Sequence, residues 1–92
     1  MKARLIIYDL SKLEQYNKIM INRALFGYTN NSNNNQYHYR VKGLLNKVHS
    51  FRFPSSAVII LEKDQKKVIS ILKKNKARYK IYPISIKRSM LS

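Results

Sequence analysis

The side chains able to perform acid–base or metal chemistry are few in this sequence and widely spaced. There are two histidines, His38 and His49, four acids and no cysteine. A histidine pair has the chemistry of a general acid and base in RNA hydrolysis, but each histidine here lies in a basic stretch typical of a solvated surface. Four scattered acids cannot build a two-metal site within one chain, and the lack of cysteine excludes a thiolate zinc site. Catalytic and nucleotide-binding motifs are also absent, so we expect no cofactor and favour a function without catalysis.

Positive charge is the dominant chemical feature of the chain. Its 92 residues include 19 Lys and Arg against four Asp and Glu, a formal net charge of +15. Because 45% of the residues are apolar and fall in compact runs, the charge does not indicate disorder. The acids are too few to pair with the bases, so a polyanionic partner is predicted. Nucleic acid fits best, ahead of an acidic protein or a membrane surface.

The positive charge is concentrated toward the C-terminal half. Residues 37–61 contain four basic and no acidic side chains, whereas residues 62–92 contain ten basic and two acidic ones. The acid-free segment supplies the first set of candidate nucleic-acid-binding residues: Arg40, Lys42, Lys47 and Arg52. The C-terminal segment supplies a secondary basic surface: Lys73, Lys74, Lys76, Arg78 and Lys80. Nothing resembles a base-reading helix, so binding should tolerate sequence, with a weak preference for RNA or single strands.

Seven tyrosines and three phenylalanines are interleaved with these bases. Rings that stack on bases, together with cations that follow phosphates, are typical of single-strand recognition. The stacking candidates are Tyr28, Tyr37, Tyr39 and Tyr82. Alternatively, Tyr37 and Tyr39 pack a sheet against helices. The side chains on the opposite face of that strand, His38, Arg40 and Lys42, then form the contact surface. The RNA-recognition motif is not supported, because the central apolar strand expected at residues 57–61 contains no ring.

The chain pattern predicts six regular elements. Residues 3–8 are branched and aromatic and predict a strand, after which Ser11 and Glu14 have the spacing of a helix capping box. The helix is expected to end near Gly27. Its core stripe is predicted to be Leu13, Tyr16, Met20 and Ala24.

The rest of the chain is predicted to contain a loop, two strands, a second helix and a last strand. Five asparagines between residues 29 and 36 predict a mobile loop, and the alternation of residues 37–42 predicts a half-buried strand. Residues 44–53 are ambiguous. Residues 57–61 predict a central strand, residues 62–75 a helix with Val68, Ile71 and Leu72 in the core, and residues 78–82 a last strand that Pro83 places at an edge.

The order strand–helix–strand–strand–helix–strand predicts an α+β, ferredoxin-like βαββαβ sandwich. Its antiparallel four-stranded sheet would carry both helices on one face, with the first and third strands central. We expect one domain over residues 1–86 and a frayed basic tail over residues 87–92.

The motif Ile7-Tyr8-Asp9 at the end of the first strand, followed by a helix, resembles the start of the Cas2 family of ferredoxin-like proteins. In that family an aspartate at this place, paired across a dimer, is linked to metal-dependent nuclease activity. The resemblance therefore implies a catalytic role for Asp9 in a nuclease. The basic residues that usually follow the aspartate are replaced by the Ser-Lys-Leu of residues 11–13.

A second resemblance covers about twenty residues. It consists of Phe26-Gly27-Tyr28, Ser32-Asn33 and Tyr37-x-Tyr39-Arg40-x-x-Gly43-Leu44-Leu45. This segment is similar to one in small archaeal proteins of unassigned function. The resemblance implies an archaeal or archaeal-virus origin and no particular activity.

The sequence also predicts where the protein acts and with what. No run approaches the roughly 20 apolar residues that span a bilayer, and no secretory signal is recognisable, so we expect a cytoplasmic protein without membrane contact. A domain this small and this charged would be stabilised by a partner. Besides nucleic acid, the candidates are a second copy in a homodimer, through paired edge strands, and a ribonucleoprotein assembly.

Overall fold

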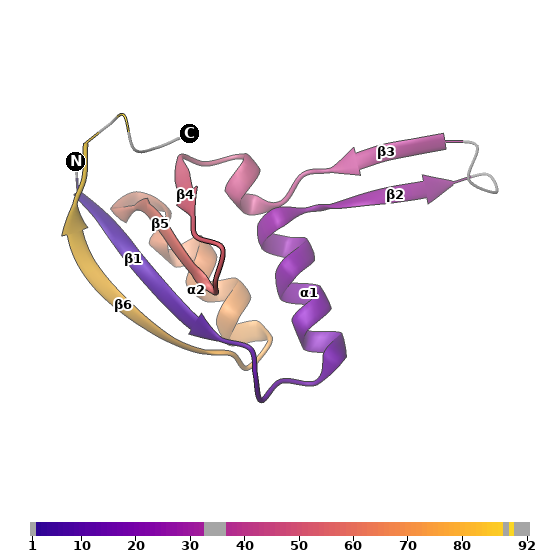
Figure 1. Cartoon of the computed structure of the whole chain (residues 1–92), viewed down its shortest axis with the longest axis horizontal. Coiled ribbons are helices and arrows are strands. Elements are labelled where there is room, and N and C mark those ends of the chain that lie inside the picture. The colour runs from indigo at the N-terminus through magenta and orange to yellow at the C-terminus, as the bar shows by residue number, and fades with distance from the viewer. Residues whose placement is uncertain (1, 33–36, 88, 90–92) are drawn as a thin grey trace.

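The computed structural model describes residues 2–32, 37–87 and 89, and the side chains of residues 30–32 and 37–38 lie outside this description. It is an α+β structure with a four-stranded antiparallel sheet, two α-helices and a separate two-stranded hairpin (Figure 1). The elements are β1 (Lys2–Asp9), α1 (Gln15–Phe26), β2 (Tyr28–Ser32), β3 (Tyr37–Val41), β4 (Ser50–Arg52), β5 (Ala57–Leu61), α2 (Gln65–Lys74) and β6 (Arg78–Ser85). Short 3₁₀ helices follow β3 (Leu44–Asn46) and β5 (Glu62–Asp64). No helix in the described residues is long and apolar enough to cross a membrane.

The four strands of the sheet lie in the order β4-β5-β1-β6, with every neighbouring pair antiparallel. The two most apolar strands, β1 and β5, are central, as the sequence predicted. β6 is an edge strand, which lets Pro83 lie opposite Arg4 without removing a hydrogen bond to a further strand. The predicted strand over residues 78–82 continues to Ser85.

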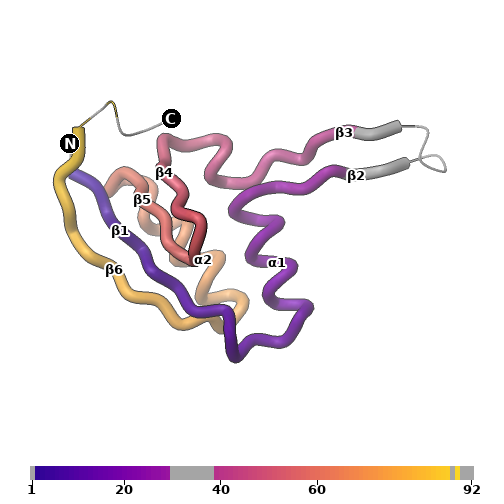
Figure 2. The backbone as a smooth tube through the Cα atoms, in the orientation of Figure 1, coloured from indigo at the N-terminus to yellow at the C-terminus, as the bar shows by residue number. Residues whose placement is uncertain are grey.

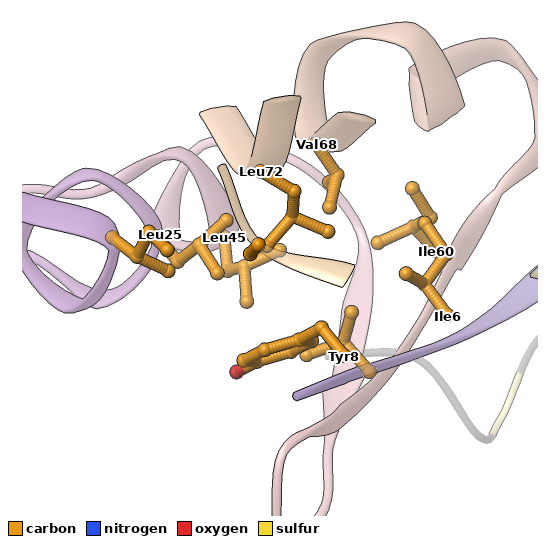
Figure 3. Packing of buried hydrophobic residues seen from close by; sticks show 10 residues of the cluster. Ile6, Tyr8, Leu25, Leu45, Ile60, Val68 and Leu72 are labelled. Carbon is orange, nitrogen blue, oxygen red and sulfur yellow. The ribbon is translucent and has the colours of Figure 1, made fainter. Parts of the chain in front are cut away.

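The core lies between one face of the sheet and the two helices. Alternate residues of the central strands, Ile6, Tyr8, Val58 and Ile60, meet buried side chains of both helices there, so α1 and α2 cover the same face. Val68 and Leu72 of α2 are fully buried and Ile71 packs beside them, which confirms the predicted stripe. Figure 3 shows Leu72 between Leu25 and Leu45 at one end of this cluster and Ile6 and Ile60 at the other.

The predicted capping box at Ser11 is wrong. Both the N–H and the hydroxyl of Ser11 donate to Oδ1 of Asp9, at 2.8 and 2.6 Å, so the serine closes a turn after β1. The helix therefore begins four residues later, at Gln15, after Glu14 in extended conformation. In a capping box the Ser11 N–H would donate to the side chain of Glu14. Here it donates to the Asp9 carboxylate instead.

The predicted core stripe of α1 is wrong for Tyr16 and Met20. Ile21 and Leu25 are fully buried, whereas Tyr16 is 68% exposed and Met20 is 37% exposed. α1 packs on the core through Ile21 and Leu25, so its Tyr16 and Met20 side faces outward. Leu13 still contacts the core from the turn before the helix.

The predicted second strand of the sheet is also misplaced. β3 does form, but it pairs with β2 in a hairpin that extends away from the sheet (Figure 2). β4 occupies the edge next to β5, with Phe51 opposite Ile59. Alternation in residues 37–42 indicated a strand correctly, yet alternation does not select the partner strand.

The predicted asparagine-rich loop over residues 29–36 is wrong for residues 29–32, which belong to β2 and pair with β3. Residues 33–36 lie outside the described residues, as do residues 88 and 90–92 of the predicted tail. The predicted second helix is divided into the 3₁₀ helix Glu62–Asp64 and α2. Asp64 is buried there and pairs with Lys67 at 3.6 Å.

The burial of α1 leads to a direct test. Ile21→Ala removes a fully buried side chain and should lower the free energy of unfolding by about 2–5 kcal/mol. Met20→Ala, one residue away on the outer side, should change it by only about 0.5 kcal/mol. Urea unfolding followed by circular dichroism measures both variants, and the reverse ranking would contradict the observed orientation of α1.

Candidate nucleic-acid interface

The hairpin leaves the body of the protein at a contact between two glycines. Gly27 follows α1 with φ of 79°, in the left-handed region, and its N–H donates to the Arg23 carbonyl at 2.9 Å. A Cβ on Gly27 would lie 2.2 Å from the Val41 carbonyl oxygen, and a Cβ on Gly43 would lie 2.3 Å from the nitrogen of Gly27. The end of α1 and the two ends of the hairpin therefore meet where no side chain fits.

A groove of about 440 Å³ lies beside this contact, and we call it the hairpin-base groove. It is lined by Met20, Arg23, Ala24, Tyr28, Val41, Lys42, Leu44 and Lys47. The Arg23 guanidinium lies over the Tyr28 ring, 4.7 Å from its centroid. Lys42 and Lys47 are exposed, and apolar side chains form the remaining lining. The groove thus combines three cations with one ring and an apolar surface.

Two other predicted site residues surround Phe26, the last residue of α1. The Arg40 guanidinium donates to the Phe26 carbonyl, one of the unpaired acceptors at the helix end. The Arg52 guanidinium lies 3.7 Å from the centroid of the Phe26 ring. Both interactions hold the arginines in place and leave their charge intact, because neither partner is an anion.

Acids are remote from this region in sequence, and three of the four are engaged elsewhere in the structure. Residues 15–61 contain six Lys and Arg and no Asp or Glu. Two ion pairs are seen in the described part of the chain, Arg4 with Glu62 at 3.4 Å and Lys67 with Asp64. The cations at the hairpin base are therefore not neutralised by any acid of their own segment.

The structure divides the predicted secondary basic surface. Lys74, Lys76 and Arg78 line a cleft of about 460 Å³ between the start of α1 and the end of α2. Asp9 and Glu14 line the same cleft, so its positive charge is partly offset. Lys73 and Lys80 are exposed and absent from that lining, and Lys80 lies two residues beyond Arg78 on β6, in register with Ile7.

The tyrosines of the hairpin do not share one environment. Tyr28 lies in the groove, and Tyr39 is 51% exposed on β3, so Tyr39 does not pack a sheet against helices. The side chain of Tyr37 lies outside the description. The packing alternative considered for this pair is thus wrong for Tyr39.

Asp9, the residue implied by the nuclease resemblance, ends β1 on the surface. The hydrogen bonds from Ser11 lower the pKa of its carboxyl, with a smaller contribution from Lys12 and Arg78. No three His, Asp or Glu side chains gather as metal ligands within the described residues. The resemblance pairs two such aspartates across a dimer, so Asp9 would depend on a second copy.

Sequence reasoning missed two features. Arg23 completes the groove, and its place in the last turn of the helix before Tyr28 was the available signal. Phe51, in a segment left ambiguous, is 40% exposed on β4, and its alternation with Phe53 indicated a strand. Comparison of the chain with protein-family models, curated proteins and solved structures finds no match, so both family resemblances remain predictions.

The glycine contact is tested by Gly43→Ala. Gly43 has an ordinary φ of −88°, so the effect of the methyl group is steric, against the backbone atoms of Gly27 and Leu25. We expect a loss of about 1–3 kcal/mol in the free energy of unfolding, as in overpacked cores. The exposed neighbour Lys42→Ala is the control, and a Gly43→Ala variant as stable as this control would contradict the contact.

The Asp9 turn is tested by Ser11→Ala. Loss of the hydroxyl should raise the pKa of Asp9 toward its ordinary value, measured by a carboxyl-carbon NMR titration. Since the folded-state pKa is lowered, Asp9 stabilises the fold above the pKa of the unfolded chain, and this is lost as pH falls through the folded pKa. Ser11→Thr keeps the hydroxyl and should keep the lowered pKa. Equal titration curves for both variants would exclude the hydroxyl as the cause.

Proposed function

We propose that this protein binds nucleic acid through the hairpin-base groove, mainly by charge and with little dependence on sequence. The observation that carries the proposal is the gathering of Arg23, Lys42 and Lys47 around Tyr28 within 47 residues that contain no acid. Cations that are not paired within the chain are free to replace the counterions of phosphates, which supplies most of the affinity in such complexes. The anchored Arg40 and Arg52 add to the same field.

The lining of the groove supports a preference for RNA or single strands. Tyr28 and the neighbouring Met20 and Val41 offer a ring and an apolar surface to a base that is not stacked within a duplex. Arg23 over the ring adds a cation beside any base held there. No helix presents a fork of side chains for base edges, so the interaction tolerates sequence.

We also propose that the architecture is ferredoxin-like, with the hairpin inserted between α1 and the second strand of the sheet. The strand order β4-β5-β1-β6, the antiparallel pairing and the helices on one face support this. The insertion matters for function because it supplies part of the groove lining. Tyr28 and Val41 belong to β2 and β3, Lys42 directly follows β3, and Arg40 lies on β3 nearby.

One observation supports assembly through strand edges as a second function. In the described residues β2 and β3 form a two-stranded sheet of their own, which another strand could extend. A second copy or a ribonucleoprotein partner would fit such an edge. The oligomeric state of the protein without nucleic acid, measured by light scattering, distinguishes this function, since a monomer would exclude self-assembly.

The proposed function is tested by Lys42→Ala with Lys47→Ala. Binding of labelled oligouridine and of a DNA duplex is measured across a salt series. We expect weaker binding of both ligands and a log–log salt slope for the RNA that falls by about 0.7 for each lost phosphate contact.

The matched control is Lys63→Ala with Lys66→Ala, which removes the same charge from exposed positions outside the groove lining. The control should keep most of the affinity. If both double variants lose affinity equally, net charge alone drives binding and the groove is not the site. If the unmodified protein binds neither ligand, the proposed function is wrong.

A further inference from the structure

The four-stranded sheet has a second face that neither helix covers. Residues directly opposite each other on neighbouring strands point to the same side. Phe51 lies opposite Ile59, Ile59 opposite Leu5, and Leu5 opposite Tyr82, so one row of apolar side chains crosses all four strands. We call this side, on which the row lies, the helix-free face.

The row has a packed centre and exposed ends. Ile59 is only 6% exposed, whereas Phe51 is 40% exposed on one edge strand and Tyr82 is 44% exposed on the other. Ile7, one pair along from Leu5, is 43% exposed. Both helices pack on the opposite side, and at one end of this face Phe53, after β4, and Ile86, after β6, pack with Ala3 and Ile59. Rings and branched side chains thus remain in solvent, which is typical of a binding surface.

The charges on this face identify the kind of partner. Lys80 lies opposite Ile7 and Arg78 opposite Asp9, on the same side of the sheet as Tyr82. Asp9 is the one acid on this side in the described chain, and its carboxylate accepts two hydrogen bonds from Ser11. A second copy laid sheet to sheet would add another +15 and more like charges at the contact. An anionic ligand with flat apolar groups has the complementary chemistry.

We propose that the helix-free face is a stacking platform for single-stranded nucleic acid. Phe51 and Tyr82 are separated by three strand spacings, roughly 14 Å, which is enough for each ring to stack on a different base. Leu5 and Ile59 form the apolar surface between them, and Lys80 contacts the backbone phosphates. A duplex does not fit this platform, because its bases are stacked on one another. The platform is a second site, and it shares only the ligand class with the hairpin-base groove.

The first experiment replaces aromatic rings by aliphatic side chains, so that the face stays apolar. Phe51→Leu with Tyr82→Leu should weaken binding of oligouridine by about tenfold for each ring, with no change in the salt slope. Binding of a DNA duplex should be unchanged. Tyr16→Leu, which removes an exposed ring from α1, is the control and should bind as the unmodified protein does.

The second experiment places a reporter on the platform and keeps a ring there. The chain contains no tryptophan, so Tyr82→Trp introduces a single one. Its fluorescence should be quenched by saturating oligouridine and not by the duplex. The platform would be overturned if the Tyr82→Trp variant binds oligouridine without quenching. It would also be overturned if the double leucine variant binds oligouridine with full affinity. Either result leaves the groove proposal standing.

Two further outcomes are decisive. A dimer of the free protein that becomes a monomer in the double leucine variant would show that a second copy occupies the face, and would overturn the proposal. The Lys42→Ala and Lys47→Ala changes can be combined with Tyr82→Trp. A loss of oligouridine affinity in that protein, with its fluorescence still quenched at higher ligand concentration, would support two separate sites. No binding of any single strand by the unmodified protein would overturn the platform, and it would overturn the groove proposal as well if the DNA duplex is not bound either.

Discussion

The contact between Gly27 and Gly43 is the constraint on which the described structure depends. They are the only glycines in the chain, and each lies where a Cβ would meet backbone atoms of the other's segment at 2.2–2.3 Å. This contact ends α1, starts β2 and returns β3 to the 3₁₀ helix Leu44–Asn46, where the Asn46 side chain accepts from the Gly43 N–H at 2.9 Å. Because the two backbones approach so closely, Arg23 and Tyr28 come beside Lys42 and Lys47, which follow fourteen or more residues later.

Acids and bases lie in different parts of the structure. Glu62 pairs with Arg4 and Asp64 with Lys67 near the start of α2, and Asp9 is engaged by Ser11. All charged side chains in the hairpin and at the end of α1 are positive. Arg40 and Arg52 are positioned by a helix-end carbonyl and a ring, which supply order without neutralisation. The result is a basic region that is built into the fold and stays available to an external anion.

Apolar residues lie on both faces of the sheet, in the core on one face and partly in solvent on the other. Ile6, Tyr8, Val58 and Ile60 close the core with the helices, and burial raises the pKa of the Tyr8 hydroxyl. The alternate residues, Leu5, Ile7, Ile59 and Phe51, face the other side. A chain this short has two helices with which to cover two faces. Since both helices pack on one face, the other retains exposed rings, and Lys80 and Arg78 on β6 give that face its charge.

The sequence by itself determined the features that depend on local pattern and composition. The central strands at residues 3–8 and 57–61, the core stripe of α2, the edge position implied by Pro83, the net charge and the acid-free segment all follow from neighbouring residues. Tertiary structure decided which partners those elements take. Ser11 has the spacing of a helix cap, but its N–H and hydroxyl donate to Asp9. Residues 37–42 have the pattern of a strand in the main sheet, but residues 37–41 pair with β2 beyond the glycine contact. Alternation specifies that a strand exists, whereas pairing depends on which residues distant in sequence are brought within reach.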